Sequence, residues 1–431
     1  MKRLWCELAW LGGDAPERGV LIEIDDGLLA SVTPGTAEPP PDAERLRGLT
    51  LPGLANAHSH AFQRALRGRT HGGTGSFWTW REQMYALAGT VDPDSYLELA
   101  RATFGEMALA GITLVGEFHY VHHDPQGEPY ADPNAMGKAV VQAAHEAGIR
   151  ITLLDACYLH GGIGRPLDDV QRRFADADAE AWAKRVDAID HHHVGAVIHS
   201  VRAVDPESCA TVAAWARDRG APLHAHVSEQ PAENDACMEA YGLTPTGVLQ
   251  QVGALADDFT AVHATHLIEH DIAALGEAGA TVCLCPTTER DLADGVGPAR
   301  ALRDAGVTLA LGSDSHAVID LFEEARAVEL DERLVTGVRG SHRAADLLRS
   351  ATYDGYACLG WNARDLADLI VVDLDSVRLA GTRTEDAVSA AVFAATASDV
   401  RDVMVDGEWI VRDRAHVRLD VAAELARTVG A

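Results

Sequence analysis

The chain is organised around an apolar run that ends in two histidines, Leu51-Pro52-Gly53-Leu54-Ala55-Asn56-Ala57-His58-Ser59-His60. Alternate side chains of a β-strand point to the same face, so His58 and His60 are expected to leave the end of a strand side by side. Two imidazoles in that arrangement can bind one metal ion. An isolated His-x-His pair is more often two polar residues that close a strand, so a metal site requires further ligands elsewhere in the chain.

Apolar runs recur along the chain and alternate with Ala-rich amphipathic segments. The runs contain many β-branched residues, which favours buried strands of a parallel sheet. Strands are expected at residues 51–57, 112–118, 151–157, 194–199, 222–227, 260–264, 281–285 and 308–312. Helices are expected between them at 95–110, 136–147, 179–189, 208–219 and 272–278. Eight such units predict an α/β fold, a closed (β/α)8 TIM-like barrel.

The two ends of the chain depart from this pattern. Alternating segments flank the turn signal Asp26-Gly27 near the start, and a second signal of the same kind, Asp406-Gly407, lies near the end. Strands that flank a barrel can pair with one another in one small unit. We therefore predict a barrel over residues 51–359 and a small β-sandwich domain built from both chain ends, residues 1–50 and 360–431.

The composition is acidic. The 431 residues include 36 Lys and Arg against 65 Asp and Glu, a formal charge of −29 that argues against nucleic acid or an anionic membrane as partner. An acidic small-molecule substrate must therefore meet arginines placed locally in its site. Seven cysteines without a C-x-x-C pair suit reduced thiols, and the N-terminal residues lack a signal-peptide pattern. These features predict a cytoplasmic protein.

Imidazole and carboxylate groups follow several of the expected strands. The chemistry of a (β/α)8 barrel lies at the carboxyl ends of its strands. Polar residues there are His58 and His60; Glu117, His119 and Tyr120; His199 and Arg202; His224, His226 and Glu229; His263 and His266; and Asp314. Nitrogen and oxygen ligands that leave one position open are what a catalytic zinc ion needs. The fourth strand ends in His199 instead of a bridging lysine, which favours one metal over two.

Some of the histidines have more than one interpretation. His224 shares a face with His226 but lies one layer deeper, which favours core packing. Spacing alone does not decide whether His263 or His266 faces the site.

Two segments beyond the strands are also ambiguous. His122 and His123 follow the second strand in a loop, and rim and binding roles are equally expected for them. The first crossover, residues 61–92, contains the glycine-rich run Gly72-Gly73-Thr74-Gly75 and the aromatic–basic cluster Phe77-Trp78-Thr79-Trp80-Arg81. This crossover is expected to be a loop that covers the site.

Taken together, these motifs resemble those of the amidohydrolase superfamily. The superfamily motifs are Asn56 to His60, His224-Ala225-His226, Ala261 to His266 and Gly312-Ser313-Asp314. Within the superfamily, the chain is similar to the deiminases that hydrolyse N-formimidoyl-L-glutamate in histidine degradation. That narrower similarity rests on His60 to Gln63, Trp80-Arg81-Glu82, Phe118 to His123, His199 to Val204, Ser228-Glu229-Gln230, Thr287-Thr288-Glu289 and Leu292 to Gly295.

The resemblance implies a site as well as a fold. It implies one Zn²⁺ per chain held by His58, His60, His226 and Asp314, with Glu229, His263 and Asp314 acting on the attacking water. It implies substrate contacts from Gln63, Arg81, Tyr120, His199 and Arg202. The implied reaction converts N-formimidoyl-L-glutamate to N-formyl-L-glutamate and ammonia, and the implied assembly is a homodimer. The chain departs from the family pattern at Arg290-Asp291, where a small residue followed by Asn is expected.

The chemistry of these residue types agrees with the implied reaction. Hydrolysis of a formimidoyl group requires a proton on the amino group before ammonia leaves, and Glu229, three residues after His226, is placed to carry it. The two carboxylates of a glutamate skeleton suit the planar forks of Arg81 and Arg202.

Two other functions remain open at this point. A deaminase of guanine or an adenosine derivative would need stacking aromatic rings and amides around its substrate. A non-catalytic metal-binding protein would need only the ligands, and the presence of Glu229, His263 and Asp314 argues against it.

Overall fold

The computed structural model describes residues 1–72 and 74–430, so Gly73 of the glycine-rich run lies outside the described residues. The barrel prediction is confirmed, because all eight expected strands form one parallel sheet in consecutive order. The strands are β5 (Leu54–Ser59), β6 (Ile112–His119), β7 (Arg150–Cys157), β8 (Val194–Ile198), β9 (Leu223–Val227), β10 (Phe259–His263), β11 (Thr281–Leu284) and β12 (Thr308–Leu311). The barrel closes where the Asp314 N–H donates to the His58 carbonyl and the His60 N–H donates to the Asp314 carbonyl, at 3.0 and 3.2 Å.

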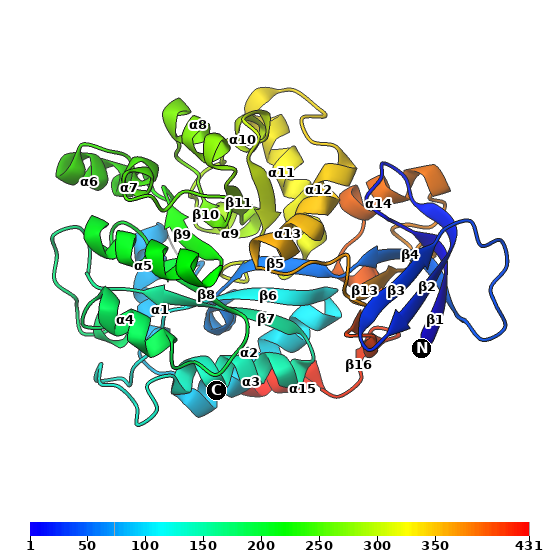
Figure 1. Cartoon of the computed structure of the whole chain (residues 1–431), viewed down its shortest axis with the longest axis horizontal. Helices are drawn as coiled ribbons and strands as arrows, with labels where there is room; N and C mark the ends of the chain where they lie inside the picture. The colour runs from blue at the N-terminus through cyan, green and yellow to red at the C-terminus, as the bar shows by residue number, and fades with distance from the viewer. Residues whose placement is uncertain (73, 431) are drawn as a thin grey trace.

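Helices surround this barrel (Figure 1). They are α1 (Phe77–Ala88), α2 (Pro93–Leu109), α3 (Ala135–Ala147), α4 (Ala179–Val186), α5 (Pro206–Arg219), α6 (Pro231–Tyr241), α7 (Pro245–Gln251), α8 (Glu269–Ala278), α9 (Pro286–Asp291), α10 (Ala299–Asp304), α11 (Leu321–Thr336), α12 (Ala344–Ser350), α13 (Tyr353–Cys358), α14 (Ala387–Phe393) and α15 (Val421–Val429), with 3-10 turns at Ala61–Leu66, Gln171–Arg173, Thr384–Asp386 and Ala397–Asp399. The five helices expected from the sequence correspond to α2, α3, α4, α5 and α8. Prolines at the first turns of α2, α5, α6, α7 and α9 suit a position that lacks an intrahelical N–H partner.

A second sheet joins the two ends of the chain, as the sequence predicts. Its order is β16-β15-β14-β13-β4-β1-β2-β3. The strands are β1 (Lys2–Ala9), β2 (Glu17–Asp25), β3 (Leu28–Thr33), β4 (Glu44–Pro52), β13 (Leu369–Val372), β14 (Val400–Val405), β15 (Glu408–Arg412) and β16 (Ala415–His416). Both expected hairpins are present, and Asp26, Gly27, Asp406 and Gly407 all have the positive φ that a tight two-residue turn requires.

The expected strand over residues 51–57 is divided between the two sheets. β4 ends at Pro52, which pairs with Leu369 of the second sheet, and β5 of the barrel begins at Leu54. Gly53 lies at the crossing, where an added Cβ would be 2.0 Å from the Thr113 Oγ1. The sequence does not show this division, because both sheets bury the residues on either side of the crossing and the run stays apolar throughout.

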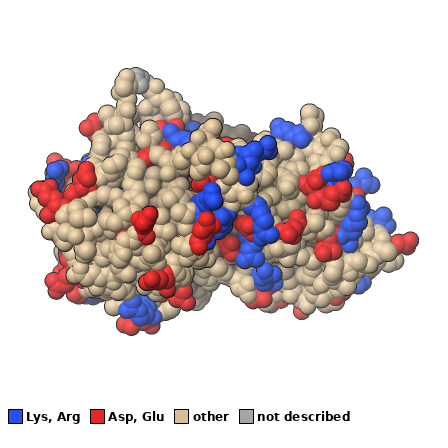
Figure 2. Space-filling view, turned by 90° about the horizontal axis from the view of Figure 1, so that it is seen from above, with Lys and Arg blue, Asp and Glu red and all other residues tan. Residues whose placement is uncertain are grey.

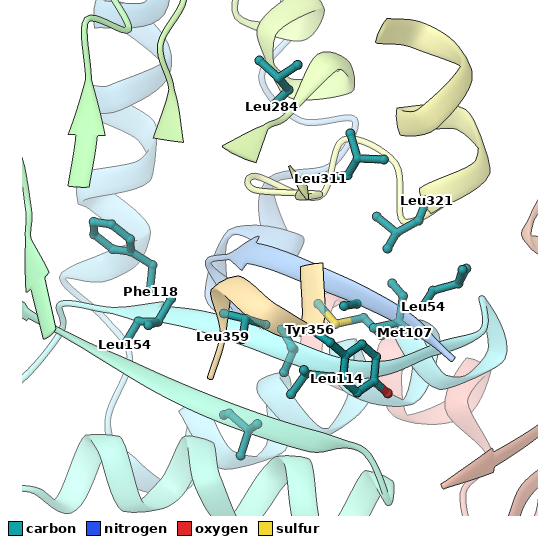
Figure 3. Close-up of a cluster of buried hydrophobic side chains, with 14 of the residues drawn as sticks. Leu54, Met107, Leu114, Phe118, Leu154, Leu284, Leu311, Leu321, Tyr356 and Leu359 are labelled. Atoms are coloured by element: carbon teal, nitrogen blue, oxygen red, sulfur yellow. The ribbon is translucent and has the colours of Figure 1, made fainter. Parts of the chain in front are cut away.

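A hydrophobic core and a small polar cluster fix the barrel to the second sheet. Figure 3 shows Leu54, Leu114 and Tyr356 packed together near the start of the first barrel strands. The Tyr356 hydroxyl donates to Asp368 Oδ2 at 2.9 Å, and the same oxygen accepts from the Arg150 guanidinium at 2.7 Å. These buried bonds hold the barrel in a fixed position relative to the sheet that precedes and follows it in the chain.

The surface carries mixed charges despite the acidic composition. Acidic and basic residues are interspersed over the face shown in Figure 2. Exposed pairs such as Arg219–Asp187 and Arg343–Asp346 are close, at 2.7 Å each, but exposed pairs of this kind contribute little stability. Among the described residues, no helix is both long enough and apolar enough to cross a membrane.

Candidate active site

Three imidazoles and one carboxylate meet at the carboxyl end of the barrel. The His58 Nε2 lies 3.2 Å from Asp314 Oδ1 and 3.3 Å from the His226 Nε2. The His60 Nε2 lies 3.4 Å from the same carboxylate oxygen. Ligands about 2.1 Å from a tetrahedral zinc ion are about 3.4 Å from one another. The four side chains are buried and have the separations of ligands that share one ion, so the residues present fit a metal centre.

Hydrogen bonds to backbone carbonyls orient two of these imidazoles. The Nδ1 of His60 lies 3.0 Å from the Phe118 carbonyl, and that of His226 lies 3.0 Å from the His199 carbonyl. Because a carbonyl only accepts, each Nδ1 carries the proton and each Nε2 presents its lone pair to the cluster. Burial lowers the pKa of His60 to about 3, which keeps the imidazole in the neutral form that binds metals.

Local contacts between the first and last strands position Asp314. The Asn56 amide donates to the Ser313 hydroxyl at 2.7 Å, and the Ser313 N–H donates back to the Asn56 side-chain oxygen at 2.9 Å. Asp314 itself has a φ of 43°, a left-handed conformation that is strained for a non-glycine residue. The two Asn56–Ser313 hydrogen bonds therefore hold the loop after β12 in the conformation that turns the Asp314 carboxylate toward the histidines.

Glu117, one of the expected strand-end residues, supports the histidine loop from behind. Its carboxyl accepts from the Ser59 hydroxyl at 2.5 Å and from the Ala61 N–H at 2.6 Å. Burial raises the pKa of Glu117 to about 8. The contacts place it against the backbone that carries His58 and His60, on the side away from the ligand atoms.

Glu229 and His263 lie beside the metal cluster. The His263 Nε2 is 3.8 Å from Glu229 Oε1, and its Nδ1 is 3.5 Å from Glu289 Oε1. Burial raises the pKa of Glu229, so its carboxyl holds a proton more readily than an exposed one. Burial opposes charge on His263, but the carboxylates of Glu229, Glu289 and Asp314 outweigh it and raise the pKa of this imidazole. The pair can hold and move protons next to the metal position.

A cavity of about 820 Å³ opens over this cluster. Its inner wall includes the ligands His60, His226 and Asp314 together with Glu229 and His263. The five residues expected to contact substrate also line it: Gln63, Arg81, Tyr120, His199 and Arg202. The Gln63 amide donates to the Tyr120 hydroxyl at 3.2 Å, while the Gln63 side-chain oxygen has no hydrogen-bond partner within the described residues. The structure thus brings all the sequence-predicted site residues to one end of the barrel.

The comparison with known families agrees with this geometry. Residues 49–410, most of the chain, match the amidohydrolase family. The chain belongs to the amidohydrolase family. It is therefore a metal-dependent hydrolase that acts on carbon–nitrogen bonds.

Individual relatives of this amidohydrolase are deaminating enzymes. The chain is 38% identical over 422 residues to formimidoylglutamate deiminase from Pseudomonas aeruginosa, covering 93% of this chain and 92% of the relative. It is 32% identical over 416 residues to a 5-methylthioadenosine/S-adenosylhomocysteine deaminase from Halobacterium salinarum, covering 94% and 90%. A solved structure of an amidohydrolase from Brucella melitensis superposes with a TM-score of 0.91 at 31% identity, covering 100% of this chain and 99% of that one. The two named enzymes, from Pseudomonas aeruginosa and Halobacterium salinarum, both catalyse deamination.

The structure of this chain resolves four histidines that the sequence left ambiguous: His122, His224, His263 and His266. His263 faces the site, whereas the His266 Nε2 bonds to the Asp294 carbonyl at 2.8 Å. His224 lies in the core with its Nε2 on the Cys358 carbonyl at 3.0 Å, as expected. His122 is buried beside His119 and Asp155, away from the residues that line the cavity.

The expectation for the first crossover was partly wrong. It does cover the site, but the cluster from Phe77 to Arg81 begins helix α1 instead of forming a loop. The Thr79 hydroxyl accepts from the Ser76 N–H at 2.9 Å and caps the first turn. The capping signal was present in the sequence but was masked by the glycines before it. The helix places the Arg81 guanidinium 4.6 Å from the centre of the Trp78 ring.

The departure at Arg290-Asp291 makes contacts outside the metal cluster. Arg290 pairs with Asp331 and Glu323 of α11, at 2.9 and 3.1 Å. Asp291 lies 2.6 Å from the His71 Nε2 of the first crossover. These two residues therefore connect helix α9, which follows β11, to its neighbours, and neither is one of the four ligands.

No role was assigned from the sequence to three residues that lie at the site, although Glu289 belongs to one of the motifs that carry the family resemblance. Glu289 contacts His263, Glu233 contacts Arg202, and Tyr158 lines the cavity after β7. Tyr158 follows a strand end directly, so its position was a usable signal. The two glutamates lie on the helices that follow β11 and β9, and only the tertiary structure shows which residues they face.

Proposed function

We propose that the protein is a zinc-dependent deiminase that hydrolyses N-formimidoyl-L-glutamate to N-formyl-L-glutamate and ammonia. The observation that carries the proposal is the presence of Arg81 and Arg202 in the cavity that contains the ligand cluster. In a chain with an excess of acidic residues, two arginines in one cavity favour a substrate with two carboxylates. The similarity to formimidoylglutamate deiminase supports the same substrate.

The donor set supports zinc and a single ion. Three imidazole nitrogens and one carboxylate oxygen, from His58, His60, His226 and Asp314, suit Zn²⁺ better than Mg²⁺ or Ca²⁺, which prefer oxygen ligands. When bound, Zn²⁺ supplies a hydroxide nucleophile at neutral pH.

The protein's own groups then bind, orient and move protons. Arg81 and Arg202 hold the two carboxylates and so fix the formimidoyl carbon near the metal position. Glu229 takes the proton of the attacking water and gives it to the amino group that leaves as ammonia, a role that its raised pKa suits. His263, close to Glu229, stabilises the charge that develops at the reacting carbon's oxygen.

The experiment that tests the substrate is ammonia release by the purified enzyme. N-formimidoyl-L-glutamate is expected to be turned over with a kcat/KM at least about 10³-fold above those of guanine, adenosine and 5-methylthioadenosine, because an uncharged substrate offers no carboxylate to the two cavity arginines. A parent enzyme that prefers an uncharged purine would contradict the proposal while leaving the deaminase class intact.

Arginine variants sharpen that experiment. Arg81→Met and Arg202→Met are each expected to lower kcat/KM for the acidic substrate by roughly 2–5 kcal/mol, since a substrate carboxylate loses its partner. Zinc content should stay unchanged. Arg172→Met, at an exposed arginine that does not line the cavity, is the matched control and should behave like the parent. Normal turnover of the acidic substrate by both the Arg81 and the Arg202 variants would refute the assignment of these arginines to the substrate carboxylates.

One observation favours a second candidate, an adenosine-type deaminase. Phe77, Trp78, Trp80 and Tyr85 line the outer part of the cavity, and aromatic rings can stack on a purine. The similarity to the 5-methylthioadenosine/S-adenosylhomocysteine deaminase also supports this second candidate. Against it, the Arg81 guanidinium lies 4.6 and 5.3 Å from the centres of the Trp78 and Tyr85 rings and covers one face of each.

A further inference from the structure

Glu233 is a buried carboxylate that the proposed reaction does not use. It lies in the first turn of α6, lines the cavity, and is 1% exposed. Its Oε1 is 3.5 Å from the Arg202 Nε, and its Oε2 accepts from the Glu229 N–H at 3.2 Å. One side chain therefore contacts both the arginine assigned to the substrate and the backbone of the residue assigned to proton transfer.

Arg202 lies between two carboxylates, those of Glu229 and Glu233. Its Nη2 lies 3.8 Å from Glu229 Oε2, while its Nε faces Glu233 at the shorter distance of 3.5 Å. Neither the Arg202 Nε nor the Glu233 Oε1 has a hydrogen-bond partner elsewhere in residues 1–72 and 74–430, so a shift of about half an ångström joins them without breaking another bond. Glu233 is thus the better placed of the two partners.

The two pairings have opposite consequences for the site. If Arg202 closed onto Glu229, its guanidinium would occupy the carboxylate that must accept and donate a proton, and it would turn away from the substrate. If the Nε side of the guanidinium is held by Glu233, its outer nitrogens stay available to a substrate carboxylate and Glu229 stays free. Both glutamates are buried and the Arg202 side chain is only 17% exposed, which makes the competition strong because charges attract one another more in a water-poor site.

We propose that Glu233 is a positioning residue that holds the Arg202 guanidinium toward the substrate and away from Glu229. The inference rests on the proposed function in one respect, since it assigns the substrate carboxylate to Arg202. The contact itself does not depend on the substrate, because the charge on Glu233 determines which carboxylate Arg202 contacts.

A purely structural role for Glu233 would have a different signature. Its Oε2 caps the chain at Glu229, and a helix cap needs an acceptor but no charge. Glu233→Gln keeps an acceptor oxygen and the same length while it removes the charge that competes for Arg202. A cap alone therefore predicts normal activity in this variant, whereas the positioning role predicts a loss.

A double-mutant cycle measures the positioning role. Glu233→Gln is expected to lower kcat/KM for N-formimidoyl-L-glutamate by about 10- to 100-fold, as is typical of groups that orient a functional residue. In the Arg202→Met background the same substitution should change kcat/KM by less than about twofold, because there is no guanidinium left to misplace. Equal losses in both backgrounds, or no loss in the single variant, would overturn the proposal.

The neighbouring helix supplies a matched control. Glu207 occupies the first turn of α5, also close behind a proline, but its side chain is exposed. Glu207→Gln should retain the kcat/KM of the parent within about twofold. Thermal unfolding of all variants checks that the folded fraction is the same, so that a loss in Glu233→Gln is not a loss of protein.

A crystal structure of Glu233→Gln gives a readout that does not depend on the substrate. The Arg202 Nη2 is expected to move from 3.8 Å to hydrogen-bonding distance of Glu229 Oε2, about 2.8 Å. An unmoved guanidinium would refute the positioning role whatever the substrate is. If the parent enzyme fails to turn over N-formimidoyl-L-glutamate, the proposed function fails, and this movement alone still decides the role of Glu233.

Discussion

Two buried clusters of the same residue types lie on opposite sides of the β6 strand end, and they differ in what surrounds them. The first, His58, His60, His226 and Asp314, opens to the 820 Å³ cavity. The second consists of His119, His122 and Asp155 and has no residue in the cavity wall.

An arginine accounts for the difference between the clusters. In the second one, both oxygens of Asp155 are paired with the Arg185 guanidinium, at 2.8 and 3.0 Å, and Trp182 donates to one of them at 3.1 Å. The His122 Nε2 lies 2.9 Å from the Ala156 carbonyl and must donate to it. The carboxylate charge that would attract a metal ion is thus already neutralised. Ligand types and proximity alone therefore do not identify a metal site.

The largest expected effect follows from removing a ligand of the first cluster. His226→Ala should abolish zinc binding and lower kcat by on the order of 10³-fold or more, since the metal contributes several kcal/mol to the transition state. The parent should contain about one zinc per chain by atomic absorption. Two tightly bound ions per chain, or full activity after complete chelation, would show that the two clusters do not differ as described.

Removal of the arginine tests the second cluster. Arg185→Met leaves the Asp155 carboxylate buried without its cation, and the free energy of unfolding should fall by roughly 3–5 kcal/mol in denaturant titrations. The activity of the folded fraction should stay near that of the parent, because Arg185 does not line the cavity. Unchanged stability would mean that the Asp155–Arg185 pair is not what fills this cluster.

A third variant separates metal binding from chemistry in the first cluster. Glu229→Gln keeps the shape of the side chain but cannot carry a proton, so kcat should fall by on the order of 10²-fold or more. Zinc content should equal that of the parent, measured on the same preparation. Near-normal kcat would assign the proton transfer to another group.

The pH dependence of stability reports on the second cluster. Burial opposes the charge on Asp155, but Arg185 outweighs it and lowers the pKa of this carboxyl to about 2. A carboxyl with a depressed pKa stabilises the fold above its unfolded pKa of about 4 and loses that contribution as the pH falls towards 2. This pKa shift corresponds to about 2 kcal/mol in the free energy of unfolding. Denaturant titrations between pH 5 and 2 should show a shallower acid decline in Asp155→Asn than in the parent.

The smallest effect is expected at His122. His122→Gln retains a donor that can reach the Ala156 carbonyl, so zinc content should be unchanged and kcat/KM should stay within about twofold of the parent. His60→Gln, the same substitution in the first cluster, serves as the contrasting variant and should lose metal. Loss of zinc in His122→Gln would place a functional ion in the second cluster.

The sequence predicted the parts of the molecule that follow from a repeated βα unit or from the spacing of residues close together in the chain. All eight barrel strands were predicted, and so were the strand-end residues that form the first cluster. The strand period places His58 and His60 on one face, and the barrel rule brings them to His226 and Asp314.

The parts that could not be predicted depend on contacts between distant residues. Nothing near Glu233 in the chain indicates that it faces Arg202, which lies 31 positions earlier. Similarly, the pairing of Asp155 with Arg185 is a tertiary contact between β7 and α4, so the sequence left His122 equally suited to a rim or a binding role. The crossing at Gly53 was hidden because both sheets bury the same apolar run.

The sheet that joins the two chain ends affects the order in which the protein folds during synthesis. Thr50 of β4 pairs with Val371 of β13, and 321 positions of chain separate them. At a translation rate of about 5–20 residues per second, roughly 15 to 65 s pass between the synthesis of these two strands. Throughout that interval one edge of β4 lacks its native neighbour, and an open strand edge is a site where chains associate wrongly. The nascent chain therefore needs that edge protected until β13 has been made, when only about the last seventh of the protein remains.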